Sequence, residues 1–341
     1  MRWVMRGMRG VLWTAAGLAC AAALFFAVSA FTPRLAAYAT RAAFSRMGKG
    51  PQYPRAADFS ARAREVTVLT DIAYPSADDH NTMDILRPAH AEGERLPVLF
   101  WVHGGGFVGG DKADVLDYMT LLAAEGMVVV SINYALAPEA RYPSPILQLR
   151  DAYAHVAAQA DAYGIDLRRV ALGGDSAGAS IVGQFVCAQV DPAYAEASGL
   201  PQAVASPEDI RGVVFLSGLL CVNLEQASGE DRGLVRTLYN KTIWAYYDEK
   251  HWQRGAQAGY ADLPAHVSPA FPPTFITDGR VGSFETQARA LDAALRALGV
   301  PVESHFYDAD LPHEYQFDMT RPASLETYAA LRAFLAARLQ A

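Results

Sequence analysis

Cysteines and charged residues are both scarce in this sequence of 341 residues. It contains three cysteines, and 19% of its residues are charged, against 52% that are hydrophobic. Cys187 and Cys221 are the only cysteines beyond the N-terminal segment. Two cysteines cannot form a disulfide framework or make up a metal site, so we expect two buried free thiols and no bound metal.

The charge balance is acidic. The formal net charge is −7, and it would be −10 without the first 30 residues, which hold three arginines and no acidic residue. A negatively charged protein repels phosphate groups, so this balance argues against a nucleic-acid partner and against tight docking on anionic lipid. The sequence has no internal repeat and no low-complexity tract, and its hydrophobic content is ample for one large core.

Apolar segments of strand length recur along the chain and, from residue 97 onward, alternate with helical patterns. They lie at about 65–74, 82–86, 97–102, 127–133, 169–172, 211–217, 273–277 and 302–307. This alternation predicts a mostly parallel sheet with helices on both faces, in one α/β domain at 63–341. The first two segments have no helix between them and are expected to form an antiparallel edge.

Helical patterns are expected at three places in the second half of the chain. One begins after residue 176 and extends to 190, and another covers 287–298 and ends at Gly299, since glycine commonly follows the last residue of a helix. The last helix is predicted to begin near Ser324, a residue type that caps helices well.

The pentapeptide Gly174-Asp-Ser-Ala-Gly178 lies between a strand pattern and a helical pattern. Glycines on both sides permit a strained strand-to-helix turn, which exposes the hydroxyl of the serine above the sheet. Ser176 is therefore predicted to be a catalytic nucleophile.

A second motif, His103-Gly-Gly-Gly106, follows the strand pattern at 97–102. Consecutive glycines let backbone N–H groups point into a pocket, where they can stabilise the oxyanion of an acyl-transfer reaction. We predict an oxyanion hole made by the amides of Gly104, Gly105 and Ala177. A phosphate-binding loop is excluded, because residues 105–112 lack the required spacing.

The chain resembles the hormone-sensitive-lipase-type esterases of the α/β-hydrolase superfamily, from about residue 65 to the C-terminus. The matching residues are His103-Gly-Gly-Gly-Phe107, Ser131-Ile-Asn-Tyr-Ala-Leu-Ala-Pro-Glu139 with Tyr142-Pro143 behind it, Gly174-Asp-Ser-Ala-Gly178 and His313. The family usually has arginine where this chain has Ala135. The resemblance implies an α/β-hydrolase fold and hydrolysis of carboxylic esters without a metal or an organic cofactor.

The remaining triad members are expected in the order serine, acid, histidine. His313 follows the last strand pattern and is the predicted general base. The acid departs from the family pattern, because relatives usually carry an Asp-Pro-Leu-like segment whose aspartate position, aligned through Phe284, falls on Gly282 here. Asp278, at the end of its strand, is the first choice for the acid, and Glu285 is the second.

The regular alternation lapses at about 220–268. This insertion is rich in aromatic residues, namely Trp244, Tyr246, Tyr247, Trp252 and Tyr260. It is placed to cover the strand ends as a small cap, or lid, and substrate wall. Each ring taken alone is better explained as one that holds the insertion down. Together with part of the tether or cap segment at 34–62, these rings are expected to form the acyl or alcohol pocket.

The N-terminal segment, residues 1–33, carries the localisation signal. Arg2, Arg6 and Arg9 precede an uncharged, apolar run from residue 10 to residue 33. That run is longer than the core of a signal peptide and long enough to span a bilayer, although Val28-Ser-Ala30 is an acceptable cleavage site. We favour a membrane anchor with the enzyme outside the cytoplasm over a cleaved signal peptide that would release it by secretion.

The leading functional hypothesis is a serine carboxylesterase that acts on small to medium acyl esters through an acyl-enzyme intermediate. A serine peptidase or amidase, or a lipase, would use the same triad. A non-catalytic ligand-binding relative is the alternative from another class. Such binders typically lose a triad residue, whereas Ser176 and His313 are both present.

Overall fold

The computed structural model describes residues 14, 17, 20, 23–25, 27–46, 50, 53–91, 93–200, 204–221 and 234–340. Within these residues eight strands form one sheet, in the order β1-β2-β4-β3-β5-β6-β7-β8. The strands are β1 (Val66–Ala73), β2 (Thr82–Pro88), β3 (Leu96–Val102), β4 (Val128–Ile132), β5 (Ile165–Asp175), β6 (Ile210–Leu216), β7 (Thr274–Thr277) and β8 (Val302–His305). Each strand overlaps one predicted segment, and β5 differs most because it extends further at both ends.

The sheet is parallel except at one edge. β2 pairs antiparallel with both β1 and β4, and all other neighbouring strands pair in parallel. The predicted antiparallel edge is thus confirmed. The carboxyl ends of β3, β5, β6, β7 and β8 meet along one border of the sheet, which is where ligands bind in open α/β sheets.

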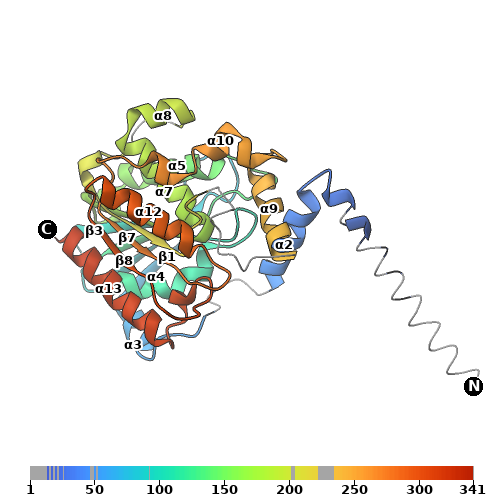
Figure 1. Cartoon of the computed structure of the whole chain (residues 1–341). Helices are drawn as coiled ribbons and strands as arrows, with labels where there is room; N and C mark the ends of the chain where they lie inside the picture. Colours follow the sequence, from blue (N-terminus) through green and yellow to red (C-terminus); the bar gives the residue numbers. More distant parts are fainter. Residues whose placement is uncertain are drawn as a thin grey trace, which may run out of the picture.

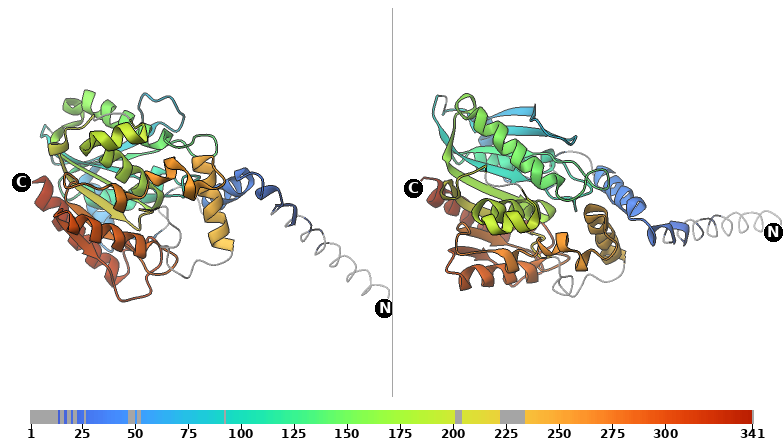
Figure 2. Two further views of the ribbon diagram at one scale, coloured as in Figure 1. Left: turned by 45° about the horizontal axis from the view of Figure 1, so that its top comes forward. Right: turned by 90° about the horizontal axis from the view of Figure 1, so that it is seen from above.

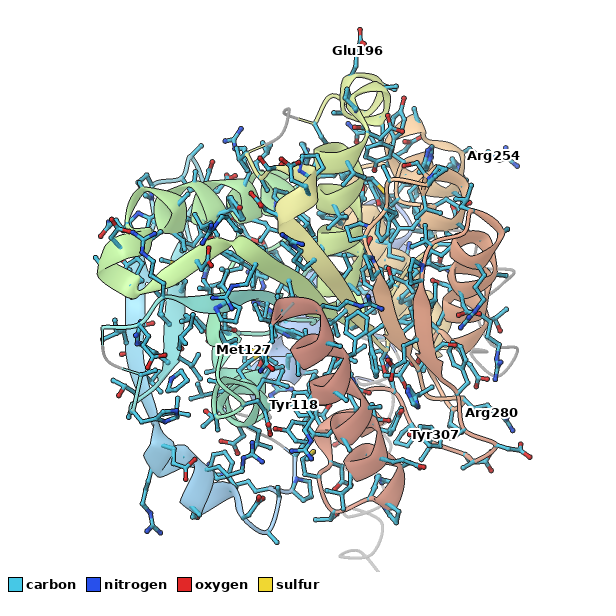
Figure 3. All side chains as sticks on the ribbon, turned by 90° about the vertical axis from the view of Figure 1, so that its left-hand side faces the viewer. Tyr118, Met127, Glu196, Arg254, Arg280 and Tyr307 are labelled. Atoms are coloured by element: carbon cyan, nitrogen blue, oxygen red, sulfur yellow. The ribbon has the colours of Figure 1, made fainter. Side chains whose placement is uncertain are left out.

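Each face of the sheet is covered by helices (Figure 1). In β3, Val98, Phe100 and Val102 pack into one core, whereas Leu99 and Trp101 pack into the other, as the two-residue period of a strand requires. The first core is closed by α5 (Ser144–Ala158), α7 (Ser176–Val190) and α12 (Glu285–Ala297), and the second by α4 (Leu116–Ala123) and α13 (Pro322–Leu339). In Figure 3, Tyr118 lies beside α13, where its ring meets that of Tyr328 edge-on with 5.6 Å between the centroids.

Shorter helices fill the connections. They are α3 (Phe59–Arg62), α6 (Ala160–Tyr163), α8 (Pro192–Ser198), α10 (Ala256–Gly259), α11 (Leu263–His266) and the 3₁₀ turns η1 (Ala63–Glu65), η2 (Lys112–Val115), η3 (Pro207–Asp209), η5 (Trp252–Arg254) and η6 (Tyr315–Phe317).

The helix ends agree with the sequence at α12 but not at α13. Gly299, with φ of +77°, follows α12 as expected. The prediction that Ser324 caps α13 was wrong, because the helix begins at Pro322 after Arg321. Proline suits the first position of a helix, and the Ser324 hydroxyl is buried and donates to the Tyr315 carbonyl at 2.7 Å.

The segment before the sheet packs onto the insertion. Helix α2 (Arg34–Arg46) contacts α9 (Leu234–Tyr247), and the two helices lie side by side in both views of Figure 2. Arg41 joins α2 to the rest of the molecule by donating to the Val108 carbonyl at 2.7 Å and the Ala137 carbonyl at 2.6 Å, and by pairing with Glu139 at 2.6 Å.

The aromatic residues of the insertion are mostly buried. Trp244, Tyr246, Tyr247 and Trp252 belong to the first core. The Tyr246 ring stacks on Phe107, just after the glycine motif, with 4.0 Å between the centroids. Residues 222–233 of the insertion lie outside the described residues.

Most of the predicted N-terminal anchor or signal at 1–33 also lies outside the described residues. Within the part of the chain that the structure describes, no helix has the length and apolar character needed to cross a membrane. Cys187 and Cys221 are both buried, and the structure joins neither to another described cysteine by a disulfide.

Candidate active site

Ser176 occupies the sharp turn between β5 and α7. Its φ is +49°, a left-handed value that is uncommon for a residue with a side chain and is typical of strained functional positions. A Cβ on Gly174 would lie 2.6 Å from the carbonyl carbon of Gly178, and a Cβ on Gly178 would lie 2.0 Å from the Val102 oxygen. The turn therefore requires both glycines, and it holds the serine above the end of β5.

His313 lies beside this serine. Its Nε2 is 3.1 Å from Ser176 Oγ, on a loop that follows β8. The backbone fixes the loop, because the His313 amide donates to the Val281 carbonyl at 3.1 Å and Val281 forms an isolated bridge with Pro312. The structure thus brings the two residues within hydrogen-bonding distance across 137 positions of sequence.

The other ring nitrogen of His313 meets a serine. Its Nδ1 is 2.7 Å from Ser283 Oγ, and the Ser283 hydroxyl donates to Asp278 Oδ1. Asp278 therefore reaches the imidazole through Ser283 and not directly. The sequence analysis missed Ser283, although its place next to Gly282, the position aligned with the family's aspartate, was a usable signal.

Asp278 is buried, and Ser283 is buried with it. Burial raises the pKa of Asp278 to about 8, an effect that the hydrogen bonds from Ser283 and from the amides of Phe284 and Gly279 only partly offset. Asp278 Oδ2 has no hydrogen-bond partner among the described residues.

Glu285, the second choice for the acid, is engaged elsewhere. Its carboxylate pairs with Arg289 at 2.6 Å and with Arg280 at 3.6 Å. Arg280 in turn reaches Asp308, and Figure 3 shows it near Tyr307 at the same edge of the molecule. These ion pairs direct Glu285 toward α12 and the loop after β7, so the structure does not bring it to His313.

The glycine loop requires a correction to the predicted oxyanion hole. The Gly104 amide donates to Asp175 Oδ2 at 2.7 Å, so it is already engaged by a buried carboxyl group and is not a free donor. Gly105 has φ of +107°, and a Cβ there would lie 2.1 Å from the Gly109 oxygen. Ala177 is in the first turn of α7, where backbone N–H groups have no partner within the helix.

His103 supports this loop from beneath. It is buried, its Nδ1 donates to the Gly104 carbonyl at 2.7 Å, and its ring stacks on Tyr134 at 4.5 Å. Burial lowers the pKa of His103 to about 4, so the ring is neutral at physiological pH. It holds the shape of the loop.

A cavity of about 130 Å³ opens beside Ser176 and His313. The N-terminal segment contributes Phe44 and Tyr53 to its wall, and the loop after His313 contributes Glu314 and Phe317. None of the five aromatic residues singled out in the insertion lines this cavity. Their packing explains how the insertion is held in place, and the aromatic part of the cavity wall comes instead from Phe44, Tyr53 and Phe317.

Comparison with known proteins agrees with this architecture. Residues 99–317 match the model of a family described by the α/β-hydrolase fold. The chain belongs to the α/β-hydrolase family. This confirms the fold class predicted from the sequence.

Individual relatives are esterases. The chain is 27% identical over 262 residues to Esterase LipQ of Mycobacterium tuberculosis, an alignment that covers 75% of this chain and 59% of that protein. It therefore spans less than two thirds of that relative's length. Among solved structures, esterase B of Lactobacillus rhamnosis superposes with a TM-score of 0.71 at 20% identity, over 90% of this chain and 96% of that one.

An esterase of the bacterial hormone-sensitive lipase family superposes with a TM-score of 0.60 at 23% identity, over 81% of this chain and 85% of that one. At such identities the superpositions show the fold. Together with the family match, they support the α/β-hydrolase fold that the sequence predicts.

Proposed function

We propose that this α/β-hydrolase is a serine carboxylesterase that acts on small to medium acyl esters. The observation that carries the proposal is the 3.1 Å contact between Ser176 Oγ and His313 Nε2, at a strained turn beside a glycine loop. A nucleophile within reach of a base, with backbone donors nearby, is the arrangement that acyl transfer needs. The esterases among the relatives support the ester as the substrate class, and a cavity of about 130 Å³ suits short acyl groups.

The proposed reaction proceeds through an acyl-enzyme. His313 Nε2 takes the proton of Ser176 as its oxygen attacks the ester carbonyl, and then returns that proton to the leaving alcohol. Water attacks the acyl-serine by the same route and releases the acid. The amides of Gly105 and Ala177 remain the proposed oxyanion donors, and Gly106, which lines the same cavity, replaces Gly104 as the third.

Ser283 and Asp278 complete the proposed site. The Ser283 oxygen accepts a hydrogen bond from Nδ1–H of His313, and the Ser283 hydroxyl donates a hydrogen bond to Asp278 Oδ1. This fixes the tautomer in which Nε2 is free to act as a base, the role that a direct carboxylate has in other triads. Ser283 is thus a positioning residue, and Asp278 acts through it.

The test is the hydrolysis of p-nitrophenyl acetate, butyrate and decanoate by the wild-type protein and by Ser176→Ala, with Ser206→Ala as the control at an exposed serine. We expect Ser176→Ala to lower kcat by about 10⁴-fold or more, and the control to match wild type. Equal turnover by Ser176→Ala, or no turnover by folded wild type, would refute the proposal. The chain-length profile separates an esterase from a lipase.

We also propose that the protein works outside the cytoplasm, held at the membrane by residues 1–33 or released after cleavage there. The basic start and the long apolar run that follows support this. Protease treatment of intact cells, followed by detection of a C-terminal tag, tests it. Full protection of the tag until the cytoplasmic membrane is broken would contradict the proposal.

A further inference from the structure

The cavity beside Ser176 is acidic and aromatic. Three carboxyl groups reach its wall, from Asp114, Asp175 and Glu314, and so do three aromatic side chains, from Phe44, Tyr53 and Phe317. Among the described residues, neither a lysine nor an arginine lines it. The histidine beneath the glycine loop is neutral, because burial lowers the pKa of His103 to about 4.

Glu314 is the carboxylate closest to the reacting groups. Its Oε1 is 3.6 Å from His313 Nε2. A Cβ on Gly104 would lie 2.9 Å from the Cβ of Ser176 and 3.0 Å from the same Glu314 oxygen. The carboxylate therefore stands next to the nucleophile, at the place where a bound substrate would lie.

Contacts on several sides hold Glu314 in this position. The Tyr53 hydroxyl donates to its Oε2 at 2.7 Å, and its backbone amide donates to Ser217 Oγ at 3.1 Å. Its φ is +57°, a left-handed value that costs free energy for a residue with a side chain. The loop accepts this cost and points the side chain into the cavity, where 18% of it remains exposed.

Asp175 lies close to Glu314, because a Cβ on Gly104 would be 2.6 Å from Asp175 Oδ2 and 3.0 Å from Glu314 Oε1. Burial and the neighbouring Glu314 charge together raise the pKa of Asp175 well above its usual range. The exposed part of the Glu314 side chain faces the cavity, while the buried Asp175 is held by Trp101 Nε1 and the Gly104 amide.

The aromatic side chains add a second attraction for positive charge. The rings of Tyr53 and Phe317 lie 5.5 Å apart between centroids and form one wall, and Phe44 of α2 faces the same space. The face of an aromatic ring attracts a cation within about 6 Å. A carboxylate beside aromatic faces suits a substituted ammonium group, which is both charged and apolar at its surface.

We propose that this cavity selects esters that carry an ammonium group close to the scissile carbonyl, with Glu314 as the residue that determines the preference. The inference rests on the proposed esterase function for its reaction, but the binding of the cation can be measured without turnover. The other role open to Glu314, stabilising the protonated His313, would affect all esters alike and is an outcome of the test.

Binding is measured by calorimetry with choline and its uncharged carbon analogue, 3,3-dimethylbutan-1-ol, on the full chain. Hydrolysis is measured with acetylcholine and 3,3-dimethylbutyl acetate, which have nearly the same shape. We expect wild type to prefer the cationic member of each pair by about tenfold, and Glu314→Gln to bring both ratios close to one. Glu303→Gln, which removes a partly exposed carboxylate outside the cavity, keeps the wild-type ratios.

The outcomes separate the two proposals. Wild-type turnover of both esters without a preference for the cationic member overturns this inference and leaves the esterase function standing. Preferential choline binding without Ser176-dependent turnover supports this inference and overturns the esterase function. An equal loss of kcat for both esters in Glu314→Gln, with the preference kept, assigns Glu314 to the support of His313 and overturns its role in selection. Tyr53→Phe, which keeps the ring and removes the hydroxyl, should weaken the preference less than Glu314→Gln.

Discussion

Among single residues, Ser283 is the one whose contacts alter the expected chemistry most. A carboxylate bonded directly to Nδ1 offers a full negative charge to the imidazolium that forms during reaction. Here that position holds a neutral hydroxyl, and the carboxyl group of Asp278 stands one hydrogen bond further away. The histidine is still oriented, while its charge is stabilised at longer range.

Removing either Ser283 or Asp278, which together orient His313, should impair catalysis. We expect Ser283→Ala and Asp278→Asn each to lower kcat/KM by roughly 10- to 100-fold, and the double variant to lose no more than the worse single one. Residues in contact that act as one unit are not additive. Steady-state kinetics on p-nitrophenyl butyrate measure this. Glu285→Gln is the control. Full additivity in the double variant would contradict the proposal that Asp278 acts through Ser283.

The pKa of Asp278 also predicts a pH dependence. Burial raises it to about 8, so Asp278 is mostly protonated and neutral below that pH and gains its charge above it. Because the charged form stabilises the imidazolium, kcat/KM should rise as the pH increases through about 8. A pH–rate profile from 5 to 10 measures this. If Asp278→Asn shows the same rise in kcat/KM near pH 8, the rise does not come from Asp278.

Ser176 and His313 could be predicted because each belongs to a local pattern with one geometric solution. The elbow needs glycines on both sides of the serine, and the histidine follows the last strand. Asp278 was the first choice for the acid, but the serine between it and His313 was not predicted, because an uncharged hydroxyl leaves no charge pattern to read. The prediction that the Gly104 amide is an oxyanion donor failed for a similar reason. That amide donates to Asp175 Oδ2 at 2.7 Å, and only the folded loop brings the two residues together.

At the scale of elements, α2 links the leading segment to the active site. Arg41 of α2 donates hydrogen bonds to the carbonyls of Val108, in the loop after the glycine motif, and Ala137. Phe44, one turn further along, presses on the glycine loop, where a Cβ on Gly109 would lie 2.7 Å from its ring. The position of the Phe44 wall thus depends on how firmly Arg41 holds the helix.

Loosening α2 should affect substrate binding more than the chemical step. We expect Arg41→Ala to raise KM for p-nitrophenyl butyrate about three- to tenfold with kcat little changed, since charged hydrogen bonds are worth about 1.5–3 kcal/mol. Arg34→Ala, at an exposed position of the same helix, is the matched control. A fall in kcat at constant KM would show that α2 acts on the reaction itself.

The central strands β3, β4, β6 and β7 were predictable because each is a largely apolar run, and burial on both faces makes such runs continuous. Part of 34–62 was predicted to form the pocket with the insertion, but the packing of α2 on α9 was not, because the sequence of one segment does not say which surface it meets. The start of α13 was missed for a related reason. The hydroxyl of Ser324 found a better partner in the Tyr315 carbonyl than in its own helix.

At the scale of the whole molecule, a buried ion pair fastens the antiparallel edge to the loop after the glycine motif. Lys112 Nζ lies 2.8 Å from Asp84 Oδ1 of β2 and 2.8 Å from Asp71 Oδ1. The side chains of Lys112 and Asp84 are 5% and 4% exposed, so neither is solvated by water.

Breaking this pair should be costly, because a buried carboxylate would lose its counter-charge. We expect Lys112→Ala to lower the free energy of unfolding by about 3–5 kcal/mol, and Arg95→Ala, which breaks the exposed pair with Asp161, by less than about 1 kcal/mol. Urea denaturation followed by fluorescence compares the two. Equal losses would mean that the Lys112 pair contributes no more than a surface contact.

The cavity wall has one more consequence. The family match covers residues 99–317, which hold the nucleophile, the histidine and its partners, whereas Phe44 and Tyr53 lie ahead of that stretch. The machinery that breaks the bond and part of the surface that chooses the molecule are thus written in separate portions of the gene. A change confined to the leading portion would alter which molecules fit the cavity and leave Ser176, His313 and Ser283 in place.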